Sequence, residues 1–580
     1  MEKHTRLTEK LNKFELALFD ALALGLVIFY SYSAVLEPAA TQYHRGIYVV
    51  ITYVLVFLVY RSRGTVGRIW DYLLMLTSIG ALGYWIYNFE AINYRAGAET
   101  ELDQWVAMIG VLVGIEVARR VVGSVFVIIG SIMLLYGVYG DSEYIPEVVQ
   151  HAGDTFPYLC TSIFYKSDGV FGIMANVLAT YIILFVIFGA FLEKSGAQRF
   201  FIDFPLAAVG HKIGGPGKVS VIASGLFGSI SGSAIANTVS TGAFTIPMMK
   251  KAGFRPHVAG GIEPAASIGG MFMPPIMGAG GFIMAELTGL PYSQIMLVAI
   301  FPALMYFFSV FMMVHYEAKK HNIVGERSKE RPGDILRREW FYILPLIVIT
   351  IFMLMGYSPG YSAILGIITC IVVSWFRKET RIDLKGFVHA SRAGAEASLK
   401  IGATVGVIGI IIGVLTYSGL ILTFADIVIE LADGKLYLTI LFIALASLIL
   451  GMGVPVTAAY LITAVVAVPA LTHLGVNPLA AHMIVYWLSQ DSNITPPVCI
   501  AAFAGATIAK ANMWATAWIA FKFAKFLYLA PFIFGYVPAF SLDGSSMDIA
   551  ITFIIVFFGT WAYSWFLSGI WMKHFKKQPA

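Results

Sequence analysis

Two clusters of small polar residues are the parts of this sequence best suited to binding an ion. Serine and threonine hydroxyls, asparagine amides and backbone carbonyls freed near glycine all offer oxygen atoms, the ligands that hard cations such as Na⁺ prefer. Both clusters lie in sequence too apolar for a surface loop. The candidate ligands of the first cluster are Ser231, Ser233, Asn237 and Thr238, followed by Gly269 and Gly270. Those of the second are Gly453, Pro455 and Thr457, followed by Asp491, Ser492, Asn493 and Thr495.

Asp491 is the strongest single candidate for an ion-binding residue, because an ionisable group at membrane depth is a functional candidate by default. It could bind a cation directly or titrate as a proton carrier. The competing interpretation is a carboxylate that caps a helix near the membrane surface. Glu263, which precedes Pro264, is a weaker candidate, for which a structural role at a helix end explains the sequence at least as well.

The two clusters belong to one duplicated unit, found at about 228–289 and again at 451–507. A shift of 222 residues places Pro247, Gly253, Pro256, Pro274 and Pro275 on Pro469, Gly475, Pro478, Pro496 and Pro497. Proline makes up only 23 of 580 residues, so four coincident prolines in one register indicate duplication. Small and hydroxylated residues in membrane helices often serve only close packing. Two clusters at matching repeat positions favour a binding function.

Each Pro-Pro pair predicts an interrupted helix, since proline lacks the N–H donor and clashes with the preceding turn. In hydrocarbon an unpaired backbone group costs several kcal/mol, so such a break survives only inside protein or beside a polar cavity. Paired repeats with discontinuous helices are typical of secondary transporters.

Composition supports a membrane setting. The chain is 58% hydrophobic and only 13% charged, too little charge to cover a soluble protein, and apolar runs of about 20 residues recur along it. We therefore expect an all-α polytopic membrane protein, with the lipid bilayer as a partner and no nucleic acid. The three cysteines are far apart, so neither a disulfide framework nor a metal site is indicated. The sequence contains no Walker A, Ser/His/Asp or HExxH pattern, which argues against an enzyme.

Apolar periodicity and charge divide the chain into two membrane modules. Residues 1–140 form a small module with four expected helices, near 17–35, 47–60, 70–88 and 121–139, and a shorter apolar piece at 105–117. Residues 141–170 are polar and irregular and are expected to be an external linker, and 171–580 form the large module. Basic residues mark the cytoplasmic side and place both termini there, on Lys3, Arg6, Lys10 and Lys13 and on Lys573, His574, Lys576 and Lys577. The first apolar run is expected to be a retained helix rather than a signal peptide.

Three long motifs carry a family resemblance: GSISGSAIANTVSTGAFTIPMMKKAGF, EPAASIGGMFMPPIMGAGGFIMAELTGLPY and GMGVPVTAAYLITAVVAVPAL with the later ITPPVCIAAFAGATIA. They closely resemble the large membrane subunit of tripartite ATP-independent periplasmic (TRAP) transporters. The best match is the fused-permease branch associated with TAXI-type binding proteins. The resemblance covers about 170–540, and the small module is similar in size and position to the small membrane subunit.

The resemblance implies ion-gradient-driven uptake of a small carboxylate across the cytoplasmic (inner) membrane, usually coupled to Na⁺ and without a cofactor. A soluble extracytoplasmic binding protein of the TAXI type would deliver the solute. The large module would be an elevator with two inverted repeats, each with a re-entrant hairpin and a broken helix. The first cluster would then lie at a hairpin tip and a helix break, and the second likewise. Ser489-Gln490-Asp491 departs from many relatives, which are uncharged there, and a carboxylate at that position could make the coupling ion H⁺.

Two other functions stay open from the residues alone. One is a cation–carboxylate symporter that needs no binding protein. The other is an ion channel, which would need a continuous polar pore rather than two matched breaks.

Overall fold

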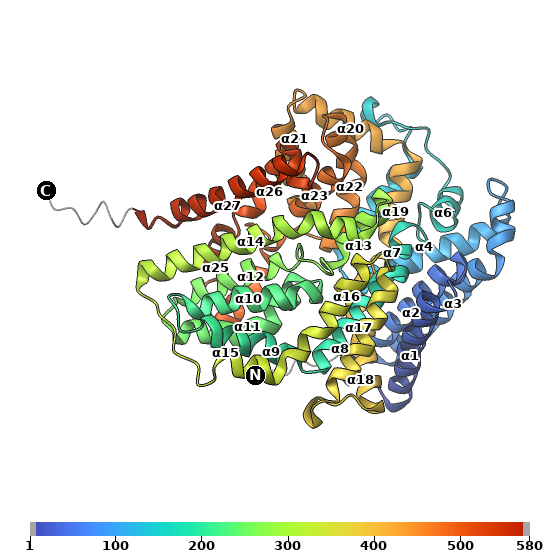
Figure 1. The fold of residues 1–580 in the computed structure, drawn as a ribbon. Coiled ribbons are helices and arrows are strands. Elements are labelled where there is room, and N and C mark those ends of the chain that lie inside the picture. Colours follow the sequence, from blue (N-terminus) through green and yellow to red (C-terminus); the bar gives the residue numbers. More distant parts are fainter. Residues whose placement is uncertain (1–6, 572–580) are drawn as a thin grey trace.

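The structure is a computed structural model that describes residues 7–571, and regular secondary structure in this range is helical (Figure 1). Nine of the helices in this range are long and apolar enough to cross a membrane. The basic residues expected at the two ends, Lys3 and Arg6 and then Lys573 to Lys577, lie outside the described residues.

The N-terminal module has five helices where four and a short apolar piece were expected. They are α1 (Lys13–Val35), α2 (Thr41–Val59), α3 (Gly64–Tyr94), α4 (Glu101–Val121) and α5 (Ser124–Val138). The apolar piece is the middle of α4, which has 21 residues because Thr100 and Asp103 cap its start reciprocally. Arg95 also donates two hydrogen bonds of 2.7 Å to the Asp103 carboxylate. This ion pair further stabilises the first turn of α4.

The expectation of an irregular linker at 141–170 is also wrong in part. Residues 156–165 form α6 (Phe156–Tyr165), which packs against α4 and buries its apolar side chains. The Tyr165 hydroxyl donates to the Asp103 carbonyl at 2.8 Å. Apolar residues within a polar stretch were enough to build a packed helix.

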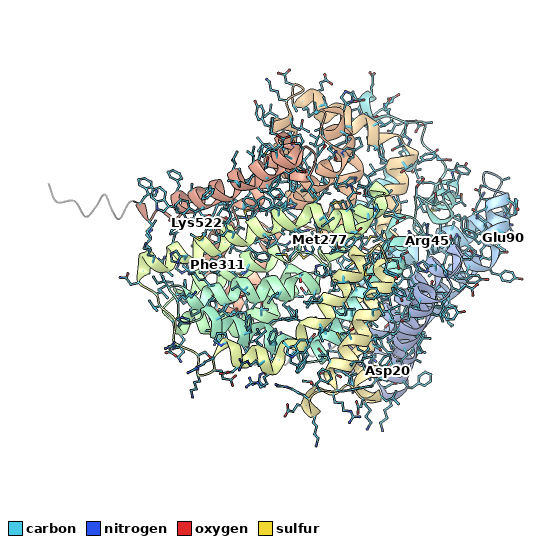
Figure 2. All side chains as sticks on the ribbon, in the orientation of Figure 1. Asp20, Arg45, Glu90, Met277, Phe311 and Lys522 are labelled. Atoms are coloured by element: carbon cyan, nitrogen blue, oxygen red, sulfur yellow. The ribbon has the colours of Figure 1, made fainter. Side chains whose placement is uncertain are left out.

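The N-terminal module packs against several helices of the large module, and α4 and α5 contact α19 (Val405–Tyr417). Helix α1 packs against α18 (Leu384–Gly402), which in turn packs against α8 (Ile183–Lys194). Asp20 of α1, labelled in Figure 2, accepts two hydrogen bonds of 2.6 Å from Arg392 of α18. At a second point Arg45 of α2 donates to the Phe171 carbonyl at 2.8 Å. One ion pair and one hydrogen bond to a backbone carbonyl therefore join the two modules.

The first repeat unit is a helical hairpin followed by a broken helix. Its elements are α10 (Gly215–Ser231), α11 (Ala234–Lys251), α12 (Pro256–Gly269) and α13 (Gly278–Thr288). The second unit repeats this order as α21 (Leu436–Leu450), α22 (Val456–His473), α23 (Pro478–Ser489) and α24 (Ile500–Ala509). Each hairpin packs on the first half of its own broken helix, and the second half packs on the other unit. The two units interlock as one body.

Both Pro-Pro pairs lie inside the interruptions, as the sequence predicted. The residue before each second half is left-handed and is not glycine: φ is 57° at Met277 and 49° at Cys499. These residues are 222 positions apart, so the duplication extends to backbone conformation.

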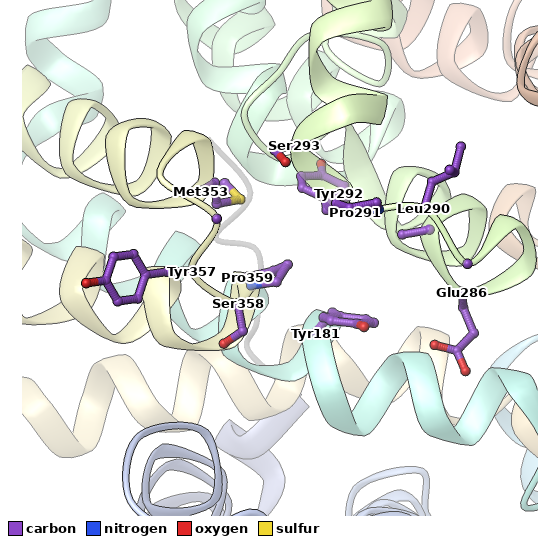
Figure 3. Close-up of a pocket in the computed structure, with 13 residues that line it drawn as sticks. Tyr181, Glu286, Leu290, Pro291, Tyr292, Ser293, Met353, Tyr357, Ser358 and Pro359 are labelled. Atoms are coloured by element: carbon purple, nitrogen blue, oxygen red, sulfur yellow. The ribbon is translucent and has the colours of Figure 1, made fainter.

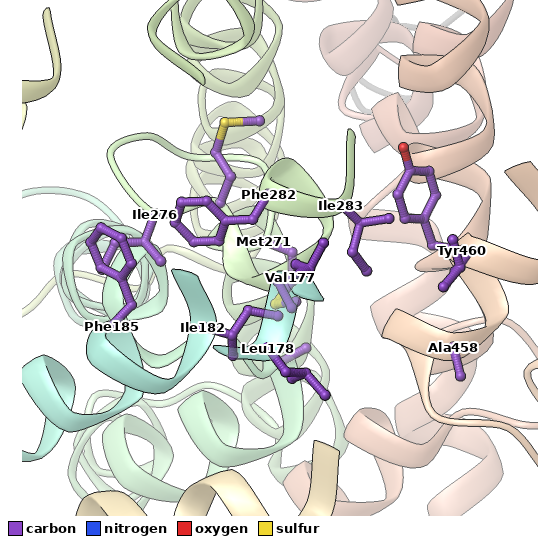
Figure 4. Packing of buried hydrophobic residues seen from close by; sticks show 14 of the residues in the cluster. Val177, Leu178, Ile182, Phe185, Met271, Ile276, Phe282, Ile283, Ala458 and Tyr460 are labelled. Atoms are coloured by element: carbon purple, nitrogen blue, oxygen red, sulfur yellow. The ribbon is translucent and has the colours of Figure 1, made fainter. Parts of the chain in front are cut away.

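Apolar side chains enclose the first break on two sides (Figure 4). Met271, Ile276 and Phe282 come from the break and from α13. On one side they face Leu178 and neighbours on η3 (Leu178–Ile182), a single turn of π-helix before α8. On the other side lies α22, with Tyr460. The freed backbone of the break is therefore buried in protein.

Candidate functional site

The first hairpin turns at Gly232 and Ser233. Gly232 is left-handed, with φ 62°, and ends α10, while the Ser233 hydroxyl caps α11 by accepting from the Ala236 N–H at 3.3 Å. Ser231 is half-buried beside this turn, and its hydroxyl lies 3.5 Å from the Ser233 carbonyl. The tip touches the first break, since a Cβ on Gly232 would lie 3.4 Å from the Gly278 Cα.

Asn237 ties this hairpin to the broken helix. It is fully buried, and its Nδ2 donates to the Ser224 carbonyl at 2.9 Å and lies 3.4 Å from the Ser267 carbonyl. The Thr238 hydroxyl donates to the Ala234 carbonyl, one turn back in α11. Asn237 therefore joins α11 to α10 and α12, whereas the bond of Thr238 stays within α11.

The freed carbonyls of the first break are covered by two tyrosines that the sequence did not single out. The Tyr486 hydroxyl lies 2.7 Å from the Met271 carbonyl and 2.5 Å from the Met277 carbonyl. The Tyr292 hydroxyl likewise reaches the carbonyls of Pro275 and Ile276, at 2.9 and 2.6 Å. Tyr486 belongs to α23, so the second unit completes the first break.

Gly269 and Gly270 stand where α12 ends. A Cβ on Gly269 would lie 2.6 Å from the ring of Phe307, and one on Gly270 would lie 2.4 Å from the Gly228 Cα. Both positions need glycine because other atoms approach so closely. The two residues shape the break and bring it against α10.

The second hairpin tip, at 451–455, meets its own break in the same way. A Cβ on Gly451 would lie 2.3 Å from the Cβ of Ser492, so tip and break are in contact. Gly453 faces the N-terminal region, where a Cβ would lie 2.1 Å from Val125 of α5. Pro455 precedes α22, and Thr457 is half-buried in its first turn.

Asp491, Ser492 and Asn493 form one short 3₁₀ turn in the second break and are all buried. Asp491 is only 2% exposed, and its Oδ1 has no hydrogen-bond partner among the described residues. The amide oxygen and nitrogen of Gln490 are likewise buried and unpartnered within residues 7–571. The Thr495 hydroxyl donates to the Asp491 carbonyl at 2.6 Å and also contacts the Tyr528 hydroxyl.

The helix-cap interpretation of Asp491 does not fit this geometry. Helix α24 begins nine residues later, at Ile500, and has no side-chain cap. A buried polar atom without a partner costs free energy, so a group of such atoms points to a ligand that completes them. A carboxylate oxygen beside an amide oxygen is suited to a cation.

Residues 109–540 match the sequence model of the family described as tripartite ATP-independent periplasmic transporter, DctM component. The chain belongs to this TRAP transporter family. The match begins inside α4 and therefore includes α5 as well as both repeat units. The protein is a transporter permease and not an enzyme, and it is a multi-pass membrane protein. A TRAP system also implies a periplasmic substrate-binding protein.

Three curated relatives are large permease proteins of TRAP transporters. The 2,3-diketo-L-gulonate permease of Escherichia coli is 25% identical over 54% of this chain and 74% of its own length. The sialic acid permease of Vibrio cholerae is 22% identical over 59% of this chain and 80% of its own length. The C4-dicarboxylate permease of Pseudomonas aeruginosa is 23% identical over 62% and 84%. A solved YdaH transporter from Alcanivorax borkumensis aligns with a TM-score of 0.49 at 16% identity, over 72% of this chain and 98% of that one.

The TRAP permease has a cavity of about 550 Å³ where α13 is followed by α14 (Tyr292–His321; Figure 3). It lies between the start of α14 and the turn at 355–358, and Tyr181 and Glu286 also line it. Tyr292 connects this cavity to the first break, because it lines the cavity while its hydroxyl reaches the carbonyls of the break. Glu286 accepts from Asn176 at 2.8 Å, and Asn176 in turn accepts from Arg45 at 3.2 Å.

Glu263 is the polar residue whose surroundings the sequence least revealed. The sequence left it as a weak functional candidate or a structural residue at a helix end, and the structure places it in the middle of α12, fully buried. Its carboxylate contacts four hydroxyls, from Ser220 and Ser224 on α10 and from Thr241 and Thr245 on α11. The only trace in the sequence is a pair of hydroxyls one helical turn apart on each arm of the hairpin.

Proposed function

We propose that this permease drives the uptake of an organic carboxylate across the cytoplasmic membrane with an ion gradient. The observation that carries the proposal is the second break, where Asp491 and Gln490 present buried, unpartnered polar atoms beside the tip of the second hairpin. We infer that these atoms bind a small cation, and that closure of the second hairpin against the break affects this binding. Na⁺ suits these oxygen ligands, and H⁺ is the other ion that a carboxylate can take.

The solute class rests on the relatives. Those named above are permeases for 2,3-diketo-L-gulonate, sialic acid and C4-dicarboxylate, which are all organic acids. We assign a carboxylate-bearing solute to this chain on that likeness, delivered by an extracytoplasmic binding protein of the TAXI type. The cavity beside Tyr292 and Glu286 is a suitable entrance to the first break.

An elevator mechanism agrees with the packing. The two interlocked units would move as the inverted repeats of a transport body, with re-entrant hairpins. The N-terminal module, in the role of a fused small subunit, would enlarge the static scaffold through α8 and α18. Close packing of Gly453 against Val125 would mark one contact across the moving boundary. We also place both termini in the cytoplasm, because basic residues are concentrated at both ends of the sequence.

The test is uptake into proteoliposomes that contain the full chain. Radiolabelled succinate, 2-oxoglutarate and sialic acid are offered with and without the purified binding protein, under a Na⁺ gradient or a proton gradient alone. Accumulation that needs both the binding protein and one gradient supports the proposal. Accumulation without the binding protein would favour a stand-alone symporter, and equilibration without accumulation would favour a channel.

A further inference from the structure

The carboxyl group of Glu263 is enclosed within the first repeat unit. The side chain is fully buried in α12, where the two arms of the hairpin pack against that helix. The Ser224 hydroxyl lies 2.6 Å from Oε1, and the hydroxyls of Ser220, Thr241 and Thr245 also contact the two carboxylate oxygens. The carboxyl group itself lies on α12, outside the interruptions at 270–277 and 490–499.

No ion pair compensates this carboxylate within residues 7–571. Helix α12 packs against α10, α11, α14, α24 and α25 (Met513–Phe523), and the charged groups on these helices are engaged elsewhere or sit near helix ends. Lys218 lies 3.1 Å from His315, Lys250 bonds to the Ala509 carbonyl, Lys251 pairs with Glu326, and Glu317 pairs with Arg255 and His321. Lys319 and Lys320 lie in the last turn of α14 and Lys522 in that of α25, and α24 has no titratable residue.

The hydroxyls can satisfy Glu263 in either protonation state. When the carboxylate is ionised, all four hydroxyls donate to it, which stabilises a buried charge. When it is protonated, Thr241 and Thr245 can turn to the carbonyls of Asn237 and Thr241, at 2.7 and 3.1 Å. The carboxyl O–H then donates to one of the threonine oxygens. Exchange between the two states needs only the rotation of two hydroxyls.

The same network reaches the first break. Thr241 exchanges its donation between Glu263 and the Asn237 carbonyl, and Asn237 donates across to the Ser224 and Ser267 carbonyls. Ser267 lies two residues before Gly269, where α12 ends. A change at the carboxyl group therefore alters bonds at the base of the break.

We propose that Glu263 is a proton-binding site of this permease, with H⁺ as a co-substrate taken up and released inside the first hairpin unit. This inference rests on the proposed transport function and deepens it, because it places a titrating group apart from the cation pocket at Asp491. A proton suits the site because the four hydroxyl oxygens already contact the carboxylate directly, and a bound metal ion would have to separate them.

The test is an infrared titration of the full chain in lipid nanodiscs, which requires no transported solute. We expect a carboxylic-acid C=O band that is lost as the pH is raised, and that is absent in Glu263→Gln. Glu317→Gln is the matched control, since Glu317 is also buried but pairs with Arg255, and this variant should keep the band. A band that persists unchanged in Glu263→Gln would overturn the proposal. So would a band that NaCl, but not choline chloride, removes at constant pH, because that result indicates a sodium site.

A second variant keeps the proposal testable where Glu263→Gln fails to fold. Removing the α10 hydroxyls in Ser220→Ala/Ser224→Ala takes away two donors, which stabilise the ionised carboxylate more than the protonated carboxyl group. The midpoint of the spectral titration should move to higher pH by about one unit or more. An unchanged midpoint would overturn the assignment. Because transport is not measured, failure here is distinguishable from failure of the uptake assay.

Discussion

Gly228 and Gly270 are in backbone contact, at the place where the first hairpin passes the first helix break. A Cβ on Gly270 would lie 2.4 Å from the Cα of Gly228 and 2.5 Å from its carbonyl carbon. A Cβ on Gly228 would in turn lie 2.6 Å from Nδ2 of Asn237 and 2.8 Å from the Cα of Gly270. The hairpin and the broken helix therefore fit only while both residues are glycine.

The variant Gly270→Ala should consequently destabilise the protein. An added methyl meets backbone rather than a flexible side chain, and overpacking of this kind costs about 1–3 kcal/mol. We expect a thermal unfolding midpoint several degrees below that of the unaltered protein, measured by size-exclusion after heating. Gly83→Ala in α3 is the control, since a Cβ there meets nothing within 4 Å. Equal midpoints for the two variants would show that the close approach has no energetic weight.

Tyr486→Phe tests whether the second unit stabilises the first break. The phenol is buried and lies against the carbonyls of Met271 and Met277, so its removal leaves buried acceptors without a donor. The expected loss of stability is about 1–3 kcal/mol, measured as a lower thermal midpoint. Tyr87→Phe is the matched control, because Tyr87 is 89% exposed. A Tyr486→Phe protein as stable as that control contradicts the role of this hydroxyl.

The sequence predicted the interruptions because proline acts locally. Two successive prolines remove two N–H donors and clash with the preceding turn, so Pro274-Pro275 and Pro496-Pro497 interrupt their helices, whereas the single prolines Pro264 and Pro302 lie inside α12 and α14. The shift of 222 residues shows that the interruption is paired. The sequence also identified Asp491 as a functional candidate, since an ionisable side chain within an apolar segment is rare without a function.

The sequence could not predict the contacts that join distant helices. Tyr486 and Met271 are 215 residues apart, and the partners of Glu263 come from two other helices. Such pairings depend on how whole helices pack, which local periodicity does not encode. The same reason explains why 156–165 was expected to be irregular, since its helix is stabilised against α4.

The ion pair between Asp20 and Arg392 tests the attachment of the N-terminal module. The two hydrogen bonds are bidentate and partly buried, with side-chain exposures of 20% and 14%. A double-mutant cycle with Asp20→Asn and Arg392→Gln should give a coupling free energy of about 1 kcal/mol or more. The control is the exposed ion pair of Arg199 and Asp203 within α9 (Ala197–Val209). The coupling free energy of that pair should be only about 0.5 kcal/mol. Similar coupling for both pairs would mean that this contact does not fix the module.

Asp491→Asn is the decisive variant for the cation pocket. Asparagine keeps the size of the side chain but can neither balance a cation nor carry a proton. The Oδ1 atom of Asp491 has no partner, and a buried carboxylate charge without a bound ion destabilises the folded protein. The Asp491→Asn protein should therefore unfold at an equal or higher temperature. Gradient-driven uptake in proteoliposomes supplied with the binding protein should fall at least about tenfold, which corresponds to about 1.4 kcal/mol of lost coupling.

The control for that variant is Asp433→Asn, whose carboxylate is exposed and pairs with Lys435. The backbone of Asp433 is left-handed, with φ 51°, and asparagine also adopts this conformation. Loss of uptake in Asp491→Asn together with normal uptake in Asp433→Asn ties ion coupling to the second break. If Asp491→Asn transports normally at every pH and Na⁺ concentration, the buried carboxylate has no part in coupling. The ion must then bind elsewhere, and the hydroxyl-lined carboxyl group of Glu263 is the next group to test, because it is the other buried carboxylate within the two repeat units.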